Sequence, residues 1–219
     1  MPTWGDILHE INLLIQQNSP APLDVIRRKY LAQLAAYTKR DTLLYATRWT
    51  SPGPIPPDFL SITDEDVQGF MEVIHGLKNE QLDIIVHSPG GSAEATEAIV
   101  SYLRAKFKNL RVIVPQAAMS AATMLACAAD RIVLVKHSSL GPVDPQMILQ
   151  TSLGVRAVPA QAILDQFEMA KTECRDPKKL GSWLPILSQY GPALLIQCQN
   201  AIDLSETLTQ DWLAKYMFQ

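Results

Sequence analysis

Cysteine is scarce in this sequence, and its scarcity argues against two kinds of stabilised domain. The three cysteines, Cys127, Cys174 and Cys198, lie far apart and form no C-x-x-C pair. A disulfide framework and a zinc site both need more closely grouped thiols, so we expect neither, and no other metal. Free thiols are typical of proteins in a reducing compartment, which predicts a cytoplasmic location.

The sequence also lacks an excess of positive charge and a long hydrophobic run. Its formal net charge is −3, which provides no electrostatic basis for binding nucleic acid or an anionic membrane. No basic stretch followed by a long apolar one occurs near the start, so no signal peptide is expected. The longest apolar run, at about 117–129, is too short to span a bilayer and predicts a buried helix.

The chain nevertheless has enough apolar residues for one well-packed domain. It has 219 residues, of which 47% are hydrophobic and 19% charged. Apolar residues recur every three or four positions at 4–17 and 22–37, which predicts two amphipathic helices. A strand is expected at 42–49, and four prolines make 51–57 an irregular loop. Thr63 and the acidic residues after it predict a helix that ends near Leu77.

From residue 82 onward, strand and helix patterns alternate. Three short apolar runs predict strands that are buried on both faces: 82–87, 111–114 and 131–136. Helical segments at 93–106 and 120–129 separate these strands, which predicts parallel pairing through right-handed crossovers. We expect a loop at 138–146, a helix from Pro159 to about Glu173, and two or three helices after it.

The first predicted crossover begins with a glycine turn, Ser88-Pro89-Gly90-Gly91-Ser92. Glycine allows positive φ and leaves no side chain between the backbone and a ligand. The sequence has neither G-x-G-x-x-G nor G-K-[ST], so a nucleotide site is a weak interpretation. Two alternatives remain: an ordinary tight turn, or a turn whose Gly90 and Gly91 N–H groups receive a developing oxyanion.

A second feature is a serine at the start of a helix made of small residues. Ser120 lies in the run 115–124, which leaves a strand and enters a helix rich in alanine. Unpaired N–H groups and the helix dipole favour negative charge there, which helps a hydroxyl to lose its proton. The N–H of Ala121 could hold an oxyanion beside the nucleophile. The alternative is that Ser120 is only an N-cap, a common role for serine.

Three segments carry a family resemblance: HSPGGSAEA at 87–95, AAMSAATMLACAADRIVL at 117–134, and KHSSLGPVDPQ at 136–146. Together they are similar to the serine dehydrogenase proteinase family, which is related to signal peptide peptidase A and more distantly to the Clp protease. The resemblance implies an α/β fold, a crotonase- or Clp-protease-like spiral of ββα units. It places helical segments at 1–38 and 161–219 on either side of a catalytic core at 39–160.

The same resemblance implies a function and a site. It implies a homo-oligomer that hydrolyses peptide bonds, with Ser120 as the nucleophile. The oxyanion hole would consist of backbone N–H groups at Gly91 and Ala121, within the turn that also contains Gly90. The word "dehydrogenase" does not describe chemistry here, because nothing in the sequence binds a nicotinamide, and no cofactor is expected.

The base that activates Ser120 is less clearly marked. A serine hydroxyl is a weak nucleophile until a neighbouring group removes its proton. Clp-type enzymes use a histidine later in the chain, and the position at that spacing is Pro145. Signal-peptide-peptidase-like enzymes use a lysine, and Lys171, 51 positions after Ser120, is near that spacing. The related lysine lies nearer the start of its helix, where this chain has Ala160 or Gln161.

Other residues compete with Lys171 for this role. Lys171 is equally consistent with a solvated lysine on a helix. His137, which follows a predicted strand, is the alternative base, and His87 ends the strand before the glycine turn. Both histidines are also consistent with purely structural roles.

We therefore predict a serine peptidase that forms an acyl-enzyme on Ser120 and uses a lysine base. Its expected partners are a peptide or protein substrate and further copies of the chain, with a membrane-associated partner as an additional possibility. Two alternatives stay open. One is an acyl-CoA-binding enzyme of the crotonase type, and the other is a catalytically silent member that binds peptides or serves as a scaffold.

Overall fold

The computed structural model describes residues 2–151 and 154–219, and at 57 and 58 the backbone alone. Two helices begin the chain, α1 (Trp4–Gln16) and α2 (Pro22–Thr38), as the apolar periodicity predicts. Thr3 caps α1, because its hydroxyl accepts the N–H of Asp6 at 3.3 Å. Pro22 occupies the first turn of α2, where its missing N–H costs no hydrogen bond.

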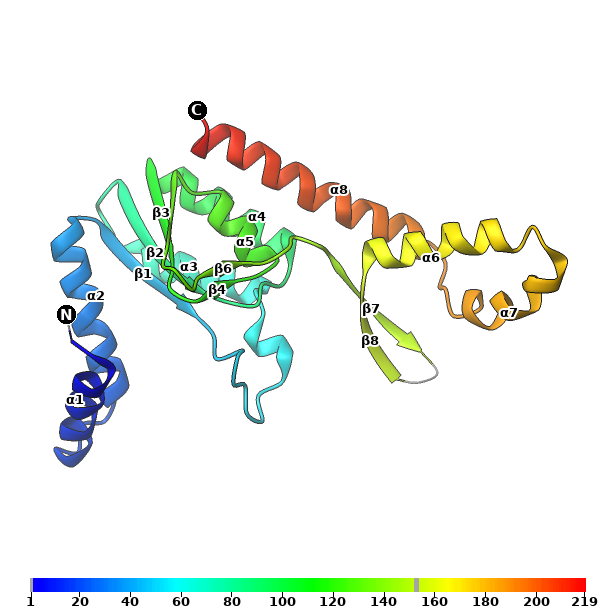
Figure 1. Cartoon of the computed structure of the whole chain (residues 1–219). Helices are drawn as coiled ribbons and strands as arrows, with labels where there is room; N and C mark the ends of the chain where they lie inside the picture. The colour runs from blue at the N-terminus through cyan, green and yellow to red at the C-terminus, as the bar shows by residue number, and fades with distance from the viewer. Residues whose placement is uncertain (1, 152–153) are drawn as a thin grey trace.

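A four-stranded parallel sheet forms the centre of the molecule (Figure 1). Its strands, in spatial order, are β1 (Asp41–Ala46), β2 (Gln81–His87), β3 (Asn109–Val114) and β5 (Arg131–Leu134). The predicted parallel pairing of the strands is confirmed. Both β1 and β5 end two or more residues earlier than the apolar runs suggest, because the chain turns there.

Three helices cover one face of this sheet: α3 (Asp64–His75), α4 (Ala93–Lys106) and α5 (Ala121–Cys127). The side chains of Leu82, Ile84 and Val86 point into this layer and are fully buried. On the opposite face Ile85 and Ile113 are only half buried. Asp83 on that opposite face is fully buried, so strand 82–87 is covered on both faces at its start and only partly on the second face at Ile85.

Two short strands connect the site to the sheet. β4 (Ala117–Ala118) and β6 (Ser139–Leu140) pair in parallel, so part of the predicted loop 138–146 is a strand. A 3₁₀ turn at Pro57–Leu60 follows the proline-rich loop. Ser88 forms an isolated bridge to Ala118, which joins the end of β2 to the segment that precedes Ser120.

The rest of the chain forms an arm that projects from the α/β core (Figure 1). The arm contains an antiparallel hairpin, β7 (Gln146–Thr151) with β8 (Gly154–Pro159), and then α6 (Ala160–Glu173) and α7 (Pro177–Leu187). Helix α8 (Leu194–Trp212) and a π-helical turn at Leu213–Met217 return to the core across α4 and α5. The sequence pattern indicates these helices but gives no signal of the hairpin.

Two apolar clusters hold these parts in place. The larger lies between the sheet and its helices and includes Trp212 from the end of α8. The smaller joins the hairpin, α6 and the start of α8 through Ala160, Ile163, Leu194 and Cys198. In the described part of the chain, no helix is long and apolar enough to cross a membrane.

Candidate active site

Ser120 is the second of the two residues, Met119 and Ser120, that join β4 to α5, and its backbone conformation is unusual. Its φ is +49° and its ψ is −122°, a region that residues with a side chain seldom adopt. The side chain makes no capping hydrogen bond, although Ser120 occupies the N-cap position of α5. The Ser120 backbone therefore forms the start of α5, while its hydroxyl is left available for chemistry.

The glycine turn packs directly against this serine. A Cβ atom at Gly90 would lie 2.4 Å from the Met119 carbonyl oxygen and 2.8 Å from both the Ala121 nitrogen and the Ser120 Cβ. Gly90 also has a φ of +93°, which a residue with a side chain would adopt only with strain. Two features at this position therefore require glycine: the conformation and the close approach to the nucleophile.

Hydrogen bonds fix the direction of the turn. The Gly90 N–H donates to the buried Ser88 Oγ at 3.1 Å, and the Gly90 carbonyl accepts the Ile62 N–H at 2.7 Å. The hydrogen bonds between described residues leave the N–H groups of Gly91 and Ala121 unpaired. Of the three predicted oxyanion residues, Gly90 thus contributes space, while the other two carry free donors next to Ser120.

These groups open onto a cleft of about 750 Å³. The glycine turn, the start of α4 and Ser120 form one side of the cleft, and β7 and α8 form the other. Its apolar lining residues include Met124, Val143, Met147, Ile148 and Leu204. Its polar lining residues include Ser92, Glu94, Gln146, Gln197 and Asn200. A cleft of this size, with a free hydroxyl and two free N–H donors at its floor, can hold an extended chain segment.

The family model that describes ClpP-like SDH-type serine proteinases matches residues 53–182, a span that includes both the glycine turn and Ser120. The chain belongs to this family. The resemblance seen in the sequence motifs is therefore confirmed, and so is the α/β fold class. The match extends beyond the core into the arm, because it ends within α7.

Individual relatives and solved structures show how similar the chain is to known proteins. The uncharacterized protein MJ0137 of Methanocaldococcus jannaschii is 31% identical over 182 residues, which is 82% of this chain and 59% of that protein. A mutant of the 1510-N membrane-bound stomatin-specific protease, in complex with a substrate peptide, is 21% identical, with a TM-score of 0.41. That similarity covers 57% of this chain and 54% of the other. A ClpP1 mutant from Listeria monocytogenes is 18% identical, with a TM-score of 0.33, over 44% of this chain and 52% of its own.

The residues predicted to act as the base do not lie in the cleft. Lys171 is exposed near the end of α6, where its Nζ lies 2.7 Å from a carboxylate oxygen of Glu168. His137 is exposed in the turn after β5. Among the described residues that line the cleft there is neither lysine nor histidine, and Glu94 is the ionisable group. Neither Lys171 nor His137 is therefore brought to Ser120 within one chain.

The remaining candidates also lie elsewhere. His87 ends β2, with its ring 5.7 Å from the ring of Trp49, and its Nδ1 is buried without a hydrogen-bond partner in the described structure. Lys136 is exposed, and Lys179 pairs with Glu173 at 3.4 Å. Lys178 is exposed at the start of α7. Each of these groups is absent from the lining of the Ser120 cleft.

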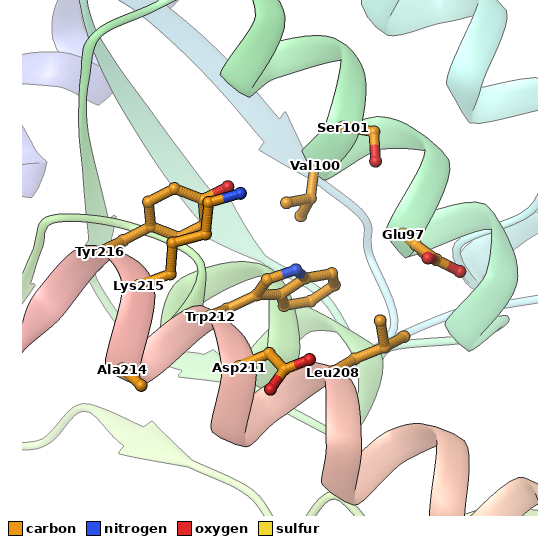
Figure 2. Close-up of a pocket in the computed structure, with 9 residues that line it drawn as sticks. All are labelled: Glu97, Val100, Ser101, Leu208, Asp211, Trp212, Ala214, Lys215 and Tyr216. Atoms are coloured by element: carbon orange, nitrogen blue, oxygen red, sulfur yellow. The ribbon is translucent and has the colours of Figure 1, made fainter.

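Lys215 belongs to a separate groove between α4 and the end of α8 (Figure 2). The buried Trp212 lies between Val100 of α4 and the π-helical turn, and Lys215 extends next to Tyr216. The Arg104 guanidinium lies 3.7 Å from the centre of the Tyr216 ring, which fastens this end of α8 to the core. These contacts anchor the end of α8 to the core. None of the described residues that line this groove lines the Ser120 cleft.

Helix α8 supplies a wall of the cleft that the motifs do not reveal. Five residues of α8 line the cleft: Gln197, Asn200, Ala201, Leu204 and Ser205. Their spacing of three, four, seven and eight positions defines one face of a helix, so a periodicity test would find the stripe. Periodicity does not show which surface the stripe faces. That information comes from the way Trp212 anchors the helix.

Cys127, on the helix that Ser120 precedes, does not compete with Ser120 as a nucleophile. Cys127 lies at the end of α5, and burial raises the pKa of its thiol. A raised pKa keeps the sulfur protonated, and a thiol is a much weaker nucleophile than a thiolate. Among the described residues, no group of three or more potential ligands could hold a metal ion.

Proposed function

We propose that this chain is a serine peptidase that cleaves peptide bonds through an acyl-enzyme on Ser120. One observation carries the proposal. The unengaged Ser120 hydroxyl, held in a rare backbone conformation, lies against a glycine turn, with unpaired N–H groups at Gly91 and Ala121 in a cleft. A serine with a purely structural role would need neither the backbone strain nor the free donors.

The chemistry follows from these groups. Ser120 Oγ adds to the carbonyl carbon of the substrate, while a base takes the hydroxyl proton. The N–H groups of Gly91 and Ala121 then donate hydrogen bonds to the oxyanion, and a single such donor accelerates related enzymes by about 10²- to 10³-fold. The C–N bond breaks, the amine leaves with the proton, and water hydrolyses the ester to restore Ser120.

A lysine base in this reaction has to come from outside the cleft of one chain. We keep Lys171 as the proposed base and propose that it reaches Ser120 from a second copy in a homo-oligomer. Among its described residues, the arm that carries Lys171 exposes five large apolar side chains, Ile148, Val155, Met169, Leu180 and Leu184, and Ile196 at the start of α8 adds a sixth. Apolar surface of this extent on a projecting arm supports a protein partner there.

A fluorophosphonate probe tests the proposal, because it reacts only with an activated serine hydroxyl. We expect the wild-type chain to be labelled at Ser120, as located by peptide mass spectrometry, and Ser120→Ala to remain unlabelled. Ser101→Ala is the matched control, since Ser101 lines the other groove, and it should be labelled like the wild type. A correctly folded wild-type chain that resists labelling would contradict the proposal.

A second candidate function is a catalytically silent member that binds peptides. The observation that favours it is the lack of lysine and histidine among the described residues of the cleft. The same experiment separates the two candidates. A silent member would bind peptide in the cleft, with or without Ser120→Ala, and would not react with the probe.

A further inference from the structure

A row of charged side chains crosses the sheet at the end that lies away from Ser120. The strand register places Asp83 of β2 beside Arg111 of β3, and Arg111 beside Arg131 of β5. Residues in register on parallel strands project from the same face, so these three side chains form one row. Arg40, which directly precedes β1, reaches the same row.

Asp83 holds two of the arginines in fixed positions. Its carboxylate is fully buried and lies 2.5 Å from Nε of Arg40 and 2.9 Å from Nε of Arg111. A second hydrogen bond joins an Arg111 amino group to the other carboxylate oxygen, so that pair is bidentate. Arg40 makes its other hydrogen bonds to Gln81 and to the carbonyls of Leu82 and Asn109.

These contacts leave many guanidinium donors unused. A guanidinium carries five N–H donors and no acceptor. Arg111 uses two of its donors, both on Asp83, and its side chain is 24% exposed. The Arg131 side chain makes no hydrogen bond or ion pair to any other described residue, although its backbone pairs with β3. Both arginines therefore have donors free for a ligand.

The free donors border a cavity of about 230 Å³. It is lined by Arg40, Asn109, Arg111, Asp130 and Arg131. Asp130 forms no ion pair with Arg131 among the described residues, and its Oδ2 accepts hydrogen bonds from Arg104 at 2.8 Å and from the Leu110 N–H at 2.7 Å. Three arginines and Asp130 line the cavity, a net charge of +2, and this sum is unchanged when their ion-pair partners Asp83 and Arg104 are included.

We propose that this cavity is a binding site for a doubly charged oxyanion of the phosphate class. The planar fork of an arginine matches two oxygens of a phosphate, and Arg111 and Arg131 present such forks to one space. A net charge of +2 favours a dianion over a singly charged carboxylate. The site lies at the opposite ends of the strands from Ser120, so it does not depend on the proposed peptidase function.

Calorimetric titration of the full chain with inorganic phosphate, at constant ionic strength, tests this site. We expect saturable binding that Arg131→Gln weakens about tenfold or more, since a charge-assisted hydrogen-bond pair is lost. The Arg131 side chain has no structural partner among the described residues, so this variant should fold normally, which circular dichroism would verify. Arg156→Gln on exposed β8 removes the same charge elsewhere and should leave the affinity within about twofold of wild type.

The remaining outcomes are also decisive. Equal phosphate affinity in wild type and Arg131→Gln would overturn the site, as would the lack of saturable binding in the wild type. Acetate that binds as tightly as phosphate would overturn the preference for a dianion. Glycerol phosphate distinguishes the source of the ligand: if it binds like phosphate, the site accepts phosphate monoesters, and if it does not, the site takes the free anion.

Discussion

At the scale of single residues, Ser88 controls which amide of the glycine turn faces the cleft. Its hydroxyl is buried and accepts the Gly90 N–H at 3.1 Å, while its backbone bonds to Ala117 and Met119 on the segment before Ser120. Ser88 therefore ties the proposed oxyanion turn to the proposed nucleophile. Its position between them makes it a positioning residue, because it acts on the substrate only through Gly90 and Gly91.

We expect Ser88→Ala to lower kcat for a peptide substrate by about 10- to 100-fold and to change KM little. The Gly91 N–H would lose its fixed direction, and outright loss of one oxyanion donor costs about 10²- to 10³-fold. Ser88→Cys keeps a weak acceptor, so its kcat should lie between those of the wild type and Ser88→Ala. The measurement is steady-state kinetics together with the rate of fluorophosphonate labelling at Ser120.

Ser138→Ala provides a matched control for Ser88→Ala. Ser138 Oγ also accepts a backbone N–H, that of Val135 at 2.9 Å, but it lies outside the cleft. Ser88→Ala leaves the buried Gly90 N–H without its acceptor, at a stability cost of about 1–3 kcal/mol, and Ser138→Ala loses both the exposed Val135 bond and the bond that Ser138 Oγ donates to the Val114 carbonyl. Similar losses of thermal stability with a fall in kcat for Ser88→Ala alone would support the positioning role. Equal falls in kcat would contradict it.

At the scale of elements, the contact between α1 and α2 depends on one carboxylate. Glu10 of α1 lies 2.6 Å from Lys29 of α2 and accepts the Tyr30 hydroxyl hydrogen bond at 3.0 Å. The Lys29 ammonium lowers the pKa of Glu10 below its ordinary value of 4.5, and Glu10 raises the pKa of Lys29. The Glu10 contribution is therefore present above pH 4.5 and is lost as the pH falls through its lowered pKa. The Lys29 contribution is lost only at strongly alkaline pH, above the ordinary value of 10.5.

Acid should therefore loosen α1 before it unfolds the core. We expect amide hydrogen exchange in α1, measured against pH and corrected for intrinsic rates, to lose protection below pH 4.5. In Glu10→Gln the loss of amide protection in α1 should be smaller. The part that remains is due to Asp6, whose pKa is lowered by its hydrogen bonds to Thr3. High salt should reduce this acid-induced loss of protection in the wild type, because the Glu10–Lys29 pair is partly exposed and is screened. Identical pH profiles for the two proteins would contradict this account.

Some elements of the fold can be predicted from the sequence, and others cannot. The parallel strands and the glycine turn follow from local apolar runs and from Gly90-Gly91, because each is specified by neighbouring residues. The hairpin β7–β8 does not, since Met147, Leu149 and Val158 pack against a cluster that includes Leu194 and Cys198 of α8, which is distant in sequence. The two-residue strand β4 is likewise determined by its contacts with Ser88 and β6. The short elements that shape the site thus depend on tertiary contacts.

At the scale of the whole molecule, sequence spacing likewise does not show whether the proposed base, Lys171, lies near Ser120. A count of 51 positions identifies Lys171 as a candidate, but it carries no information on where α6 lies. In the structure, α6 belongs to the projecting arm and packs against the start of α8 (Figure 1). Lys171 therefore points to its neighbour Glu168 and not to the cleft of its own chain. A cleft with Ser120 and two unpaired N–H groups, but with no lysine or histidine among its described lining residues, is consistent with our proposal that the base comes from a second copy.

Mixing two inactive variants tests whether the base crosses between copies. Ser120→Ala lacks the nucleophile and Lys171→Ala lacks the proposed base, so each should be inactive alone. If Lys171 acts on a neighbouring copy, unfolding and refolding the two together should restore part of the wild-type activity, because mixed oligomers contain some sites with both groups. His137→Ala should stay active, and its loss of activity would transfer the role of base to His137. Full activity in Lys171→Ala would exclude this lysine, and inactive mixtures would place its action within a single chain that rearranges.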